Sequence, residues 1–395
     1  MDVLSLRKQQ ILVVPAILAV LAGCSGSSTG AEPPAAALAN HESGWAPMAI
    51  SGPIRAMGAE STKPAMHRDR GSSWMSRAAA AATSLLYVSD LTTNDVFIFN
   101  SAGAPVGVIK NGNTGFVNPY GQCVDKTGDV FVAYYISGFP VEYARGATTP
   151  RTTFYYSDGD TDGCSIDPTS GNLGVANWDG FYGGSIAVYN APFFNNQPPS
   201  CWYFPGTVGC VKCNPSACMP APPSSDVNYR FWPPGYDNMG NLYVESYNVA
   251  TATSQVWELP HGGNSLVAIP TNVTINYPGS VMWDGKYITL TDQDYNGVFQ
   301  TAIYQMTAPP SGGLTTAGTT VLTDTCNNNY VDVAQPFIAG KKNTPVNKTQ
   351  GTDVVGGNLD CTNRFDEWAY TAGGNPTATL PGAPAQPSGQ SVSVK

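Results

Sequence analysis

The stretch that decides the fold is PYGQCVDKTGDVFV, residues 119–132. An apolar run ends at Asp125, a short turn containing Gly128 follows, and a second apolar run begins at Val130. Two apolar runs joined by a short turn with glycine predict a β-hairpin. The pattern returns as GCSIDPTSGNLGV (163–175), as PGYDNMGNLYV (234–244) and, more weakly, as GSVMWDGKYI (279–288).

These hairpins repeat at the spacing of propeller blades. The aspartates at 125, 167, 237 and 284 are 42, 70 and 47 residues apart, and the long interval contains a cysteine-rich insertion at about 201–232. An earlier unit begins at LYVSD (86–90), and a degenerate last unit lies around Val331 to Ala339. Each hairpin is followed by further short apolar segments, and four-stranded units at this period are β-propeller blades. We therefore expect an all-β, six-bladed β-propeller over residues 85–382, with a pair of immunoglobulin-like sandwiches as the alternative.

The repeat has a family resemblance. The phrase P-x-G-x-x-x-D-x-x-G-x-x-Y/F-V, running into N-x-V-x-x-F, resembles the NHL-type six-bladed propeller family over about residues 85–380. The first unit has no clear inner strand ahead of Leu86. We expect that either residues 391–395, within a tail at 383–395, or part of the preceding linker supplies the strand that closes the ring.

The N-terminus predicts export. Arg7 and Lys8 precede an apolar run from Ile11 to Leu21, which is too short to span a bilayer and predicts a signal peptide at 1–23. The tetrad Leu-Ala-Gly-Cys at 21–24 resembles the lipobox of bacterial lipoproteins. That resemblance implies diacylglycerol, and usually a further acyl chain such as palmitate, on Cys24, and two or more chains anchor stably. An ordinary secreted protein with a chance cysteine is the alternative.

The lipobox resemblance also predicts where the chain lies. Residues 24–84 are rich in Ala, Gly, Ser and Pro, which predicts a flexible linker from the lipidated cysteine to the folded domain. Ser25, rather than Asp, follows the cysteine, which by that resemblance implies the outer membrane if the cell has one. We expect a protein of the bacterial cell envelope, lipid-anchored and extracytoplasmic.

The charge balance argues against nucleic acid as a partner. The formal net charge of −9 becomes −10 when cleavage removes Arg7, Lys8 and Asp2, and the chain has no basic run. A nucleic-acid-binding surface needs clustered Lys and Arg.

The cysteine count fits an oxidising compartment. Nine cysteines less Cys24 leave eight, an even number for which disulfides are expected. Cys123 and Cys164 share one register in adjacent inner strands, and Cys326 and Cys361 fall on one face of the last blade. The insertion carries four more with the spacing C-x8-C-x2-C-x4-C, which fits either a zinc knot or two disulfides of open connectivity: Cys201, Cys210, Cys213 and Cys218.

One face of a propeller gathers the loops that carry function. The loops from the fourth strand to the next blade, and from the second strand to the third, share this face. Here those loops are aromatic and acidic, and we expect the ligand-binding residues to be Tyr134, Tyr135, Trp178, Asp179, Tyr182, Trp232 and Tyr247.

Two of these loops match the pattern D-x-D-x-[DN]-G. Alternate acids on a tight turn offer the oxygen ligands that calcium prefers, and glycine makes the bend. The candidate calcium ligands are Asp158, Asp160 and Asp162 in the first turn and Asp292, Asp294 and Asn296 in the second. Two solvated turns rich in turn-forming residues are the alternative.

The sequence favours binding over catalysis and assigns no catalytic residue. His261, the only histidine in the body, falls in a turn expected on the opposite face, so a His-dependent triad lacks parts. Gluconolactonase-type propellers resemble this fold, but their Glu-Gly-Pro start is not found in the first blade. Asp179 with Asp292 is a weaker acid-base candidate.

The favoured function is therefore a membrane-tethered binding module that presents an aromatic, acidic face to a glycan, peptide or protein. The alternatives are a metal-dependent hydrolase or lyase of the gluconolactonase-like class and a purely structural envelope protein.

Overall fold

The structure is a computed structural model that describes residues 73–394 apart from 77–78, 80–81, 111–115, 156–158, 181–182, 213–227, 309–311, 325–330, 332, 334, 341–343, 346–350, 359–363, 380–383 and 385. These residues all belong to one compact unit, Ile54–Lys395. The expected signal peptide, Cys24 and most of the linker lie outside them. Among the described residues, no helix is long and apolar enough to cross a membrane.

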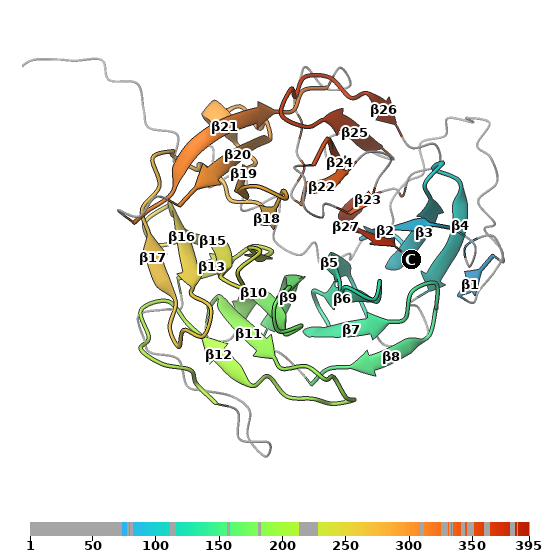
Figure 1. The fold of residues 1–395 in the computed structure, drawn as a ribbon, viewed down its shortest axis with the longest axis horizontal. Coiled ribbons are helices and arrows are strands. Elements are labelled where there is room, and N and C mark those ends of the chain that lie inside the picture. Colours follow the sequence, from blue (N-terminus) through green and yellow to red (C-terminus); the bar gives the residue numbers. More distant parts are fainter. Residues whose placement is uncertain are drawn as a thin grey trace, which may run out of the picture. The chain divides into compact units, whose positions relative to one another are not determined.

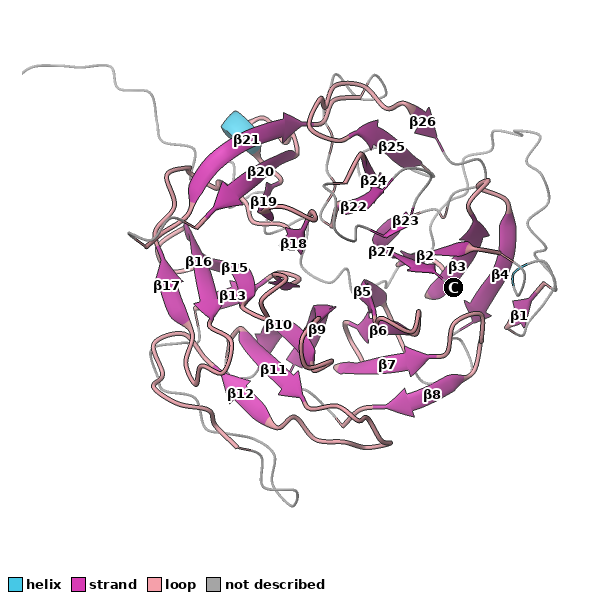
Figure 2. Ribbon diagram, viewed as in Figure 1, coloured by secondary structure: helices cyan, strands magenta, loops and turns pink. Residues whose placement is uncertain are grey.

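Six antiparallel sheets surround a central axis as the blades of a propeller (Figure 1). The regular structure is almost entirely strand (Figure 2). Three sheets have four strands, and the other three add a short fifth one. The expected six-bladed propeller is thus confirmed, and the alternative of two sandwiches is wrong.

The first three blades follow the chain from residue 74 to residue 203, with the C-terminal strand added. The first blade contains β1 (Trp74–Met75), β2 (Ser84–Asp90), β3 (Asp95–Asn100), β4 (Pro105–Lys110) and β27 (Pro387–Val394). The second contains β5 (Pro119–Val124), β6 (Val130–Tyr134), β7 (Phe139–Tyr143) and β8 (Pro150–Thr153). The third contains β9 (Gly159–Ile166), β10 (Leu173–Gly180), β11 (Ser185–Tyr189) and β12 (Cys201–Tyr203).

The last three blades depart more from the simple pattern. The inner strand of the fourth is split, so the blade contains β13 (Tyr229–Phe231), β14 (Gly235–Tyr236), β15 (Leu242–Asn248), β16 (Thr253–Leu259) and β17 (Val267–Ile269). The fifth contains β18 (Met282–Trp283), β19 (Ile288–Asp292), β20 (Ala302–Thr307) and β21 (Thr315–Val321), with the 3-10 helix η1 (Tyr295–Gly297) between β19 and β20. The sixth contains β22 (Phe337–Gly340), β23 (Thr344–Pro345), β24 (Asp353–Gly357), β25 (Phe365–Ala369) and β26 (Ala378–Thr379).

Two distant segments of the chain complete the first blade. The C-terminal strand β27 lies on the inner side of β2, antiparallel to it, with Ser84 opposite Val394 and Val88 opposite Gln390 (Figure 1). On the outer side, β1 pairs with β4, with Trp74 opposite Val108. The ring is therefore closed by β-pairing between the two ends of the domain, which leaves the inner edge of β2 covered.

The repeated aspartates hold the hairpin turns. Asp237 Oδ1 accepts the backbone N–H of Met239 at 2.8 Å and of Asn241 at 2.9 Å. Backbone N–H groups two residues on bond in the same way to Asp125, Asp167 and Asp284. The glycines of these turns have φ between 79° and 96°, a region that L side chains rarely adopt: Gly128, Gly171, Gly240 and Gly285. The repeated aspartate and glycine residues therefore stabilise the hairpin turns of the propeller.

Apolar side chains fill the gaps between neighbouring blades. In the described residues, six buried clusters each join one blade to the next. The cluster between the first and second blades includes Leu85, Ile98 and Val132, all fully buried. The cluster between the sixth and first includes Val392 of β27, so the closing strand is also part of the core.

Glycines let the inner strands approach one another at the axis. A Cβ atom on Gly121 of β5 would lie 2.5 Å from the carbonyl oxygen of Asp162 in the next blade. A Cβ atom on Gly235 of β14 would lie 2.6 Å from the carbonyl oxygen of Val281. On Gly389 of β27 it would collide with the Tyr120 carbonyl oxygen. Gly121 is the glycine of the repeated Pro-x-Gly phrase. Its place in that phrase is explained by the close approach of the backbones of neighbouring inner strands.

Two disulfides are formed by the described cysteines. Cys123 and Cys164 join the inner strands of the second and third blades, with Cα atoms 5.5 Å apart, as their shared register predicts. Cys201 pairs with Cys210, with Cα atoms 5.3 Å apart, which favours the disulfide interpretation of the insertion over a zinc knot for these two. The other four predicted disulfide cysteines lie outside the described residues: Cys213, Cys218, Cys326 and Cys361.

Replacing Gly389 by Ala tests the close approach at the axis. The new Cβ would meet the Tyr120 backbone, which cannot swing away as a side chain can. We expect the free energy of unfolding to fall by about 2–3 kcal/mol, as for other overpacked sites, measured by urea denaturation.

Gly318→Ala in the outer strand β21 is the matched control. There the Cβ would meet only the end of the Gln305 side chain, which can move, so the loss should stay below about 1 kcal/mol. Equal losses in the two variants would contradict a special constraint at the axis.

Candidate functional site

The candidate site lies on the face where β6, β10, β15 and β19 end. Loops from each second strand to the third, and from each blade to the next, emerge on this face; we call it the upper face. Tyr135 directly follows β6, Trp178 is near the end of β10, and Tyr247 is near the end of β15. Trp232 directly follows β13, and Tyr277 lies on the connection into the fifth blade. The topology thus brings aromatic residues from separate blades to one face.

These five rings and that of Tyr120 form a continuous series, which we call the aromatic band. Its members, in order of contact, are Tyr120, Tyr135, Trp178, Trp232, Tyr277 and Tyr247. The successive ring centroids are 5.8, 6.0, 6.1, 5.4 and 6.0 Å apart. These separations and the tilted or edge-to-face geometry are those of favourable aromatic pairs. The band crosses from the second blade to the fifth.

Exposure divides the band into two parts. Tyr120, Tyr135 and Trp178 are half-buried, whereas the other three rings are buried. Beside the half-buried end, Val117 is 38% exposed and Ile136 is 53% exposed. The open end is therefore an apolar and aromatic surface on the second and third blades, and the buried end supports it.

The guanidinium group of Arg230 stacks on Trp178, the member of the band from the third blade. The guanidinium carbon of Arg230 lies 4.5 Å from the centre of a Trp178 ring, which is the geometry of a cation–π contact. Arg230 comes from β13 of the fourth blade, so this contact also ties the two blades together on the upper face.

The predicted ligand-binding residues divide into three groups. Tyr135, Trp178, Trp232 and Tyr247 are members of the band. Tyr134 is a correction: it is fully buried between the first two blades, where its hydroxyl is 2.9 Å from that of Tyr143, because successive residues of β6 point to opposite sides. The side chain of Asp179 and all of Tyr182 lie outside the described residues.

The expected ligand-binding residues did not include Tyr120 and Tyr277, although the order of strands along the chain assigns both to this face. A usable signal was present, because both adjoin the proline of the repeated Pro-x-Gly phrase, as Trp232 does one residue earlier in its repeat. In these three blades, an aromatic residue next to that proline belongs to the band.

Buried carboxyl groups lie beneath the band. Glu245 of β15 and Asp292 of β19 are both fully buried between the fourth and fifth blades. Glu245 Oε2 accepts the backbone N–H of Gly279 at 3.0 Å, and Asp292 Oδ1 accepts that of Tyr277 at 3.1 Å. The other oxygen of each carboxyl group has no hydrogen-bond partner among the described residues.

Burial controls the protonation of these groups. It raises the pKa of Glu245 well above the usual range, and the charge of Asp292 raises it further. It raises the pKa of Asp292 to about 6, against the lowering effect of backbone hydrogen bonds from Tyr277 and Asp294. Tyr304 of β20 faces the same pair. A buried acid pair without a cation nearby favours holding a proton.

Asp162 of β9 is a third buried acid. Burial raises its pKa well above the usual range, with a further contribution from Asp160, and its Oδ2 has no partner in the described part of the chain. Its backbone carbonyl accepts a hydrogen bond from Gln335 of the sixth blade at 3.3 Å. This bond reaches across the axis from the opposite blade.

Where the structure describes them, the residues of the two predicted calcium turns lie in β9 and around η1. Asp160 and Asp162 lie in β9, which extends the backbone, and Asp158 lies outside the described residues. In the second turn, Asp292 bonds to backbone N–H groups and Asp294 Oδ1 accepts that of Phe299 at 2.8 Å, while Asn296 has φ of 59° within η1. These carboxylates shape the turn. The described residues contain no group of three or more His, Cys, Asp or Glu placed to hold a metal ion.

Fold and site together define a six-bladed β-propeller with an aromatic band on one face. No family model and no curated protein matches the sequence. Among solved structures, the chain is similar to a protein of unknown function from Bacteroides caccae, with 15% identity, a TM-score of 0.52, and coverage of 80% of this chain and 100% of that one. It is also similar to the β-propeller domain of Cps50 (Swd1) from Myceliophteria thermophila, with 9% identity, a TM-score of 0.48, and coverage of 80% and 88%. At 15% identity, the similarity to the Bacteroides caccae protein shows the fold alone.

Replacing Glu245 by Gln tests the buried acid pair. Because the folded-state pKa of Glu245 is raised, this group destabilises the fold as pH rises from the unfolded value of about 4.3 through the folded value. Gln keeps the shape and cannot ionise. We expect urea unfolding at pH 8 to show a gain of at least about 1 kcal/mol, because one pKa unit corresponds to about 1.4 kcal/mol.

At pH 4 the gain should largely disappear, because Glu245 is then protonated in the folded state and mostly protonated in the unfolded state. Asp353→Asn, at a half-buried acid of the sixth blade, is the control and should change stability little at either pH. An E245Q protein that is less stable than the parent at both pH values would refute the protonation argument.

Proposed function

We propose that this chain is a binding module and that its partner docks on the open end of the aromatic band. The observation that carries the proposal is the band itself, six touching rings that end in a half-buried surface beside exposed Val117 and Ile136. Rigid aromatic groups beside apolar side chains supply most of the energy in many interfaces. Rings held by neighbouring rings lose little entropy on binding.

The apolar rim favours a polypeptide partner over a glycan. A sugar would stack on Tyr135 or Trp178, but its hydroxyl groups would gain nothing from Val117 and Ile136. A partner with apolar side chains and basic groups would suit both the rim and the net charge of −9. A glycan remains the alternative outcome of the test below.

A hydrolase or lyase is less well supported. The carboxyl pair with raised pKa values, Glu245 and Asp292, is fully buried under the band. In this conformation neither group can touch a substrate on the upper face, whereas proton transfer needs hydrogen-bond contact with the reacting group.

We infer a location in the cell envelope, tethered by lipid on Cys24. The support is the lipobox resemblance at residues 21–24 together with the two disulfides, which belong to oxidising compartments. We also assign the repeat to the NHL-like class of propellers on its sequence phrase. In this proposal, the residues between Cys24 and β1 hold the propeller at a distance from the membrane surface, whereas β1 and Ala79, within the expected linker 24–84, belong to the first blade.

The docking proposal predicts site-specific crosslinking. With a photoreactive amino acid at position 136, the full chain in the cell that produces it should crosslink to one defined protein, identified by mass spectrometry. The change Trp178→Ala should reduce the yield at least about tenfold, as expected for an interface anchor.

The matched control places the photoreactive group at Met239, which is 63% exposed on the opposite face. Equal crosslinking from both positions, or selective binding of a glycan array by the parent but not the W178A protein, would contradict a polypeptide partner on this face.

The anchor proposal predicts a modified cysteine. Mass spectrometry of the mature N-terminal peptide should find Cys24 as the first residue carrying acyl chains, and Cys24→Ser should move the protein from the membrane to the soluble fraction. Cys213→Ser is the control, because it removes a cysteine without removing the anchor. Unmodified Cys24 in membrane-bound protein would overturn the proposal.

A further inference from the structure

A groove on the opposite, lower face separates the third and fourth blades. Its volume is about 510 Å³, within the range of small-molecule sites. The turn of the third blade at 167–172 and the turn of the fourth at 260–263 form its two walls at one end, and β11 and β12 form its floor. No residue of the aromatic band lines it, so the groove is separate from the site described above.

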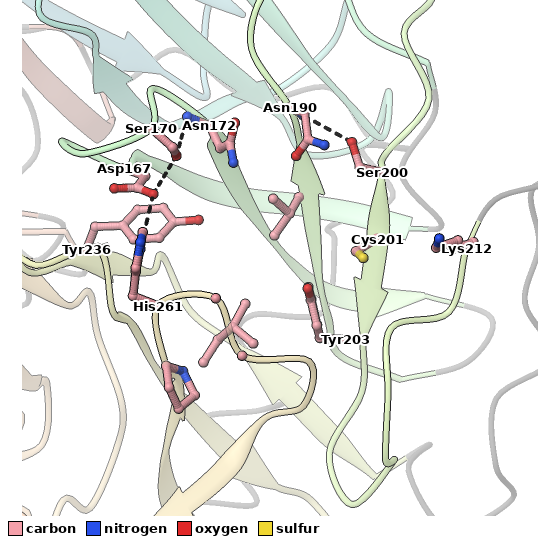
Figure 3. A pocket seen from close by; sticks show the side chains of 16 residues that line it. Asp167, Ser170, Asn172, Asn190, Ser200, Cys201, Tyr203, Lys212, Tyr236 and His261 are labelled. Atoms are coloured by element: carbon pink, nitrogen blue, oxygen red, sulfur yellow. Dashed lines mark hydrogen bonds and ion pairs between the residues drawn. The ribbon is translucent and has the colours of Figure 1, made fainter.

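Two tyrosines present their hydroxyl groups to this groove. Tyr203 of β12 is 7% exposed and Tyr236 of β14 is 8% exposed, and both line the groove (Figure 3). The described residues form no hydrogen bond to either phenol hydroxyl, and burial raises both pKa values. The rings are mostly buried, but neither hydroxyl oxygen is among the buried polar atoms that lack a partner, so both reach the open space of the groove and are suited to a partner from a ligand.

Glycines make room for this arrangement. A Cβ atom on Gly174 would lie 3.1 Å from the Tyr236 hydroxyl, and one on Gly240 would lie 2.5 Å from Nδ1 of His261. Gly240 has φ of 88° and Gly262 has φ of 69°, so both turns use conformations that suit glycine. The side chains around the groove can take these positions because glycine, which has no Cβ atom, occupies positions 174 and 240.

One end of the groove carries an ordered acid. Burial alone would raise the pKa of Asp167, but hydrogen bonds from Ser170 and Thr169 outweigh it and hold the pKa below the ordinary value. Asp167 Oδ2 lies 4.0 Å from Nδ1 of His261, which is about half exposed. Figure 3 shows Asp167, Ser170 and His261 together beside the Tyr236 ring.

The opposite end carries amide, hydroxyl and ammonium groups. Asn190, Ser200 and Lys212 lie there (Figure 3). The Cys201–Cys210 disulfide and the pairing of Trp202 with Val211 fix the chain just before Lys212. The middle of the groove is lined by the apolar side chains of Val188, Leu259 and Pro260.

From this arrangement we propose that the lower groove binds a short neutral saccharide of one or two rings. Hydroxyl and amide groups at both ends can donate and accept, as a polyol requires. The tyrosine rings and Pro260 between them offer flat surfaces to the C–H faces of a sugar. A strongly anionic ligand is disfavoured because Asp167 stays charged at one end, and a purely apolar ligand would leave the two phenol hydroxyls unpartnered.

Titration calorimetry and saturation-transfer NMR on the purified full chain test this proposal. The probes are glucose, N-acetylglucosamine, cellobiose and the disaccharide of N-acetylglucosamine, each up to about 10 mM, a range that detects weak sites. Binding of at least one probe is expected. Tyr236→Phe keeps the ring and removes one hydroxyl, so it should weaken that binding about fivefold, the effect of one neutral hydrogen bond.

Two controls separate this groove from the rest of the molecule. Tyr189→Phe, in the third blade, removes a hydroxyl that donates to the Tyr155 carbonyl outside the groove, and it should leave affinity unchanged. Trp178→Ala on the upper face should also leave it unchanged. Failure of all four sugars to bind, or binding that is lost in W178A but kept in Y236F, would overturn the proposal, and neither result depends on the partner proposed for the aromatic band.

Discussion

The close approach of the inner strands at the axis is the constraint on which the rest of this propeller depends. Six blades can surround a narrow centre only if neighbouring backbones come nearer than a side chain allows, and Gly121, Gly235 and Gly389 provide that approach. Once the inner strands meet in this way, the six apolar clusters between blades follow, because each blade is held against the next along its length. The last of these contacts involves β27, so the geometry of the centre also requires the C-terminal strand.

The same constraint separates scaffold from function in the sequence. The repeated glycines and aspartates serve the axis and the hairpin turns, and Asp237 illustrates this through its bonds to the turn backbone. The side chains that differ from blade to blade lie at the ends of the strands. Trp178, Trp232 and Tyr277 belong to different blades, yet the common radius of the ring brings their rings into contact.

The acidic side chains of the two faces differ in their protonation. Glu245 and Asp292 would cost a great deal if buried as two charges, and no described cation neutralises them, so the fold favours a protonated pair there. Asp167 on the lower face shows the opposite solution, since hydroxyl and backbone donors keep it ionised. The two faces therefore differ in chemistry as well as in position: a sealed acid pair lies under an aromatic band on one, and a charged acid lies beside an open polar groove on the other.

Local patterns in the sequence determined the architecture and part of the site. Spacing of the hairpins, with glycine and aspartate at fixed places, predicted six blades, and the shared register of Cys123 and Cys164 predicted their disulfide. Tyr135 and Trp178 could be assigned to one face because strand order alone fixes which loops share it. Tyr134 could not be assigned correctly so easily, since one residue of register turns a side chain from the face into the core. The acids at 160 and 162 resembled a metal-binding turn, but the backbone there extends into a strand whose pairing with β10 is a tertiary contact. The burial of Glu245 against Asp292 and the groove between two blades were likewise decided only by the tertiary structure, because both depend on how separate repeats pack, which no local pattern of residues contains.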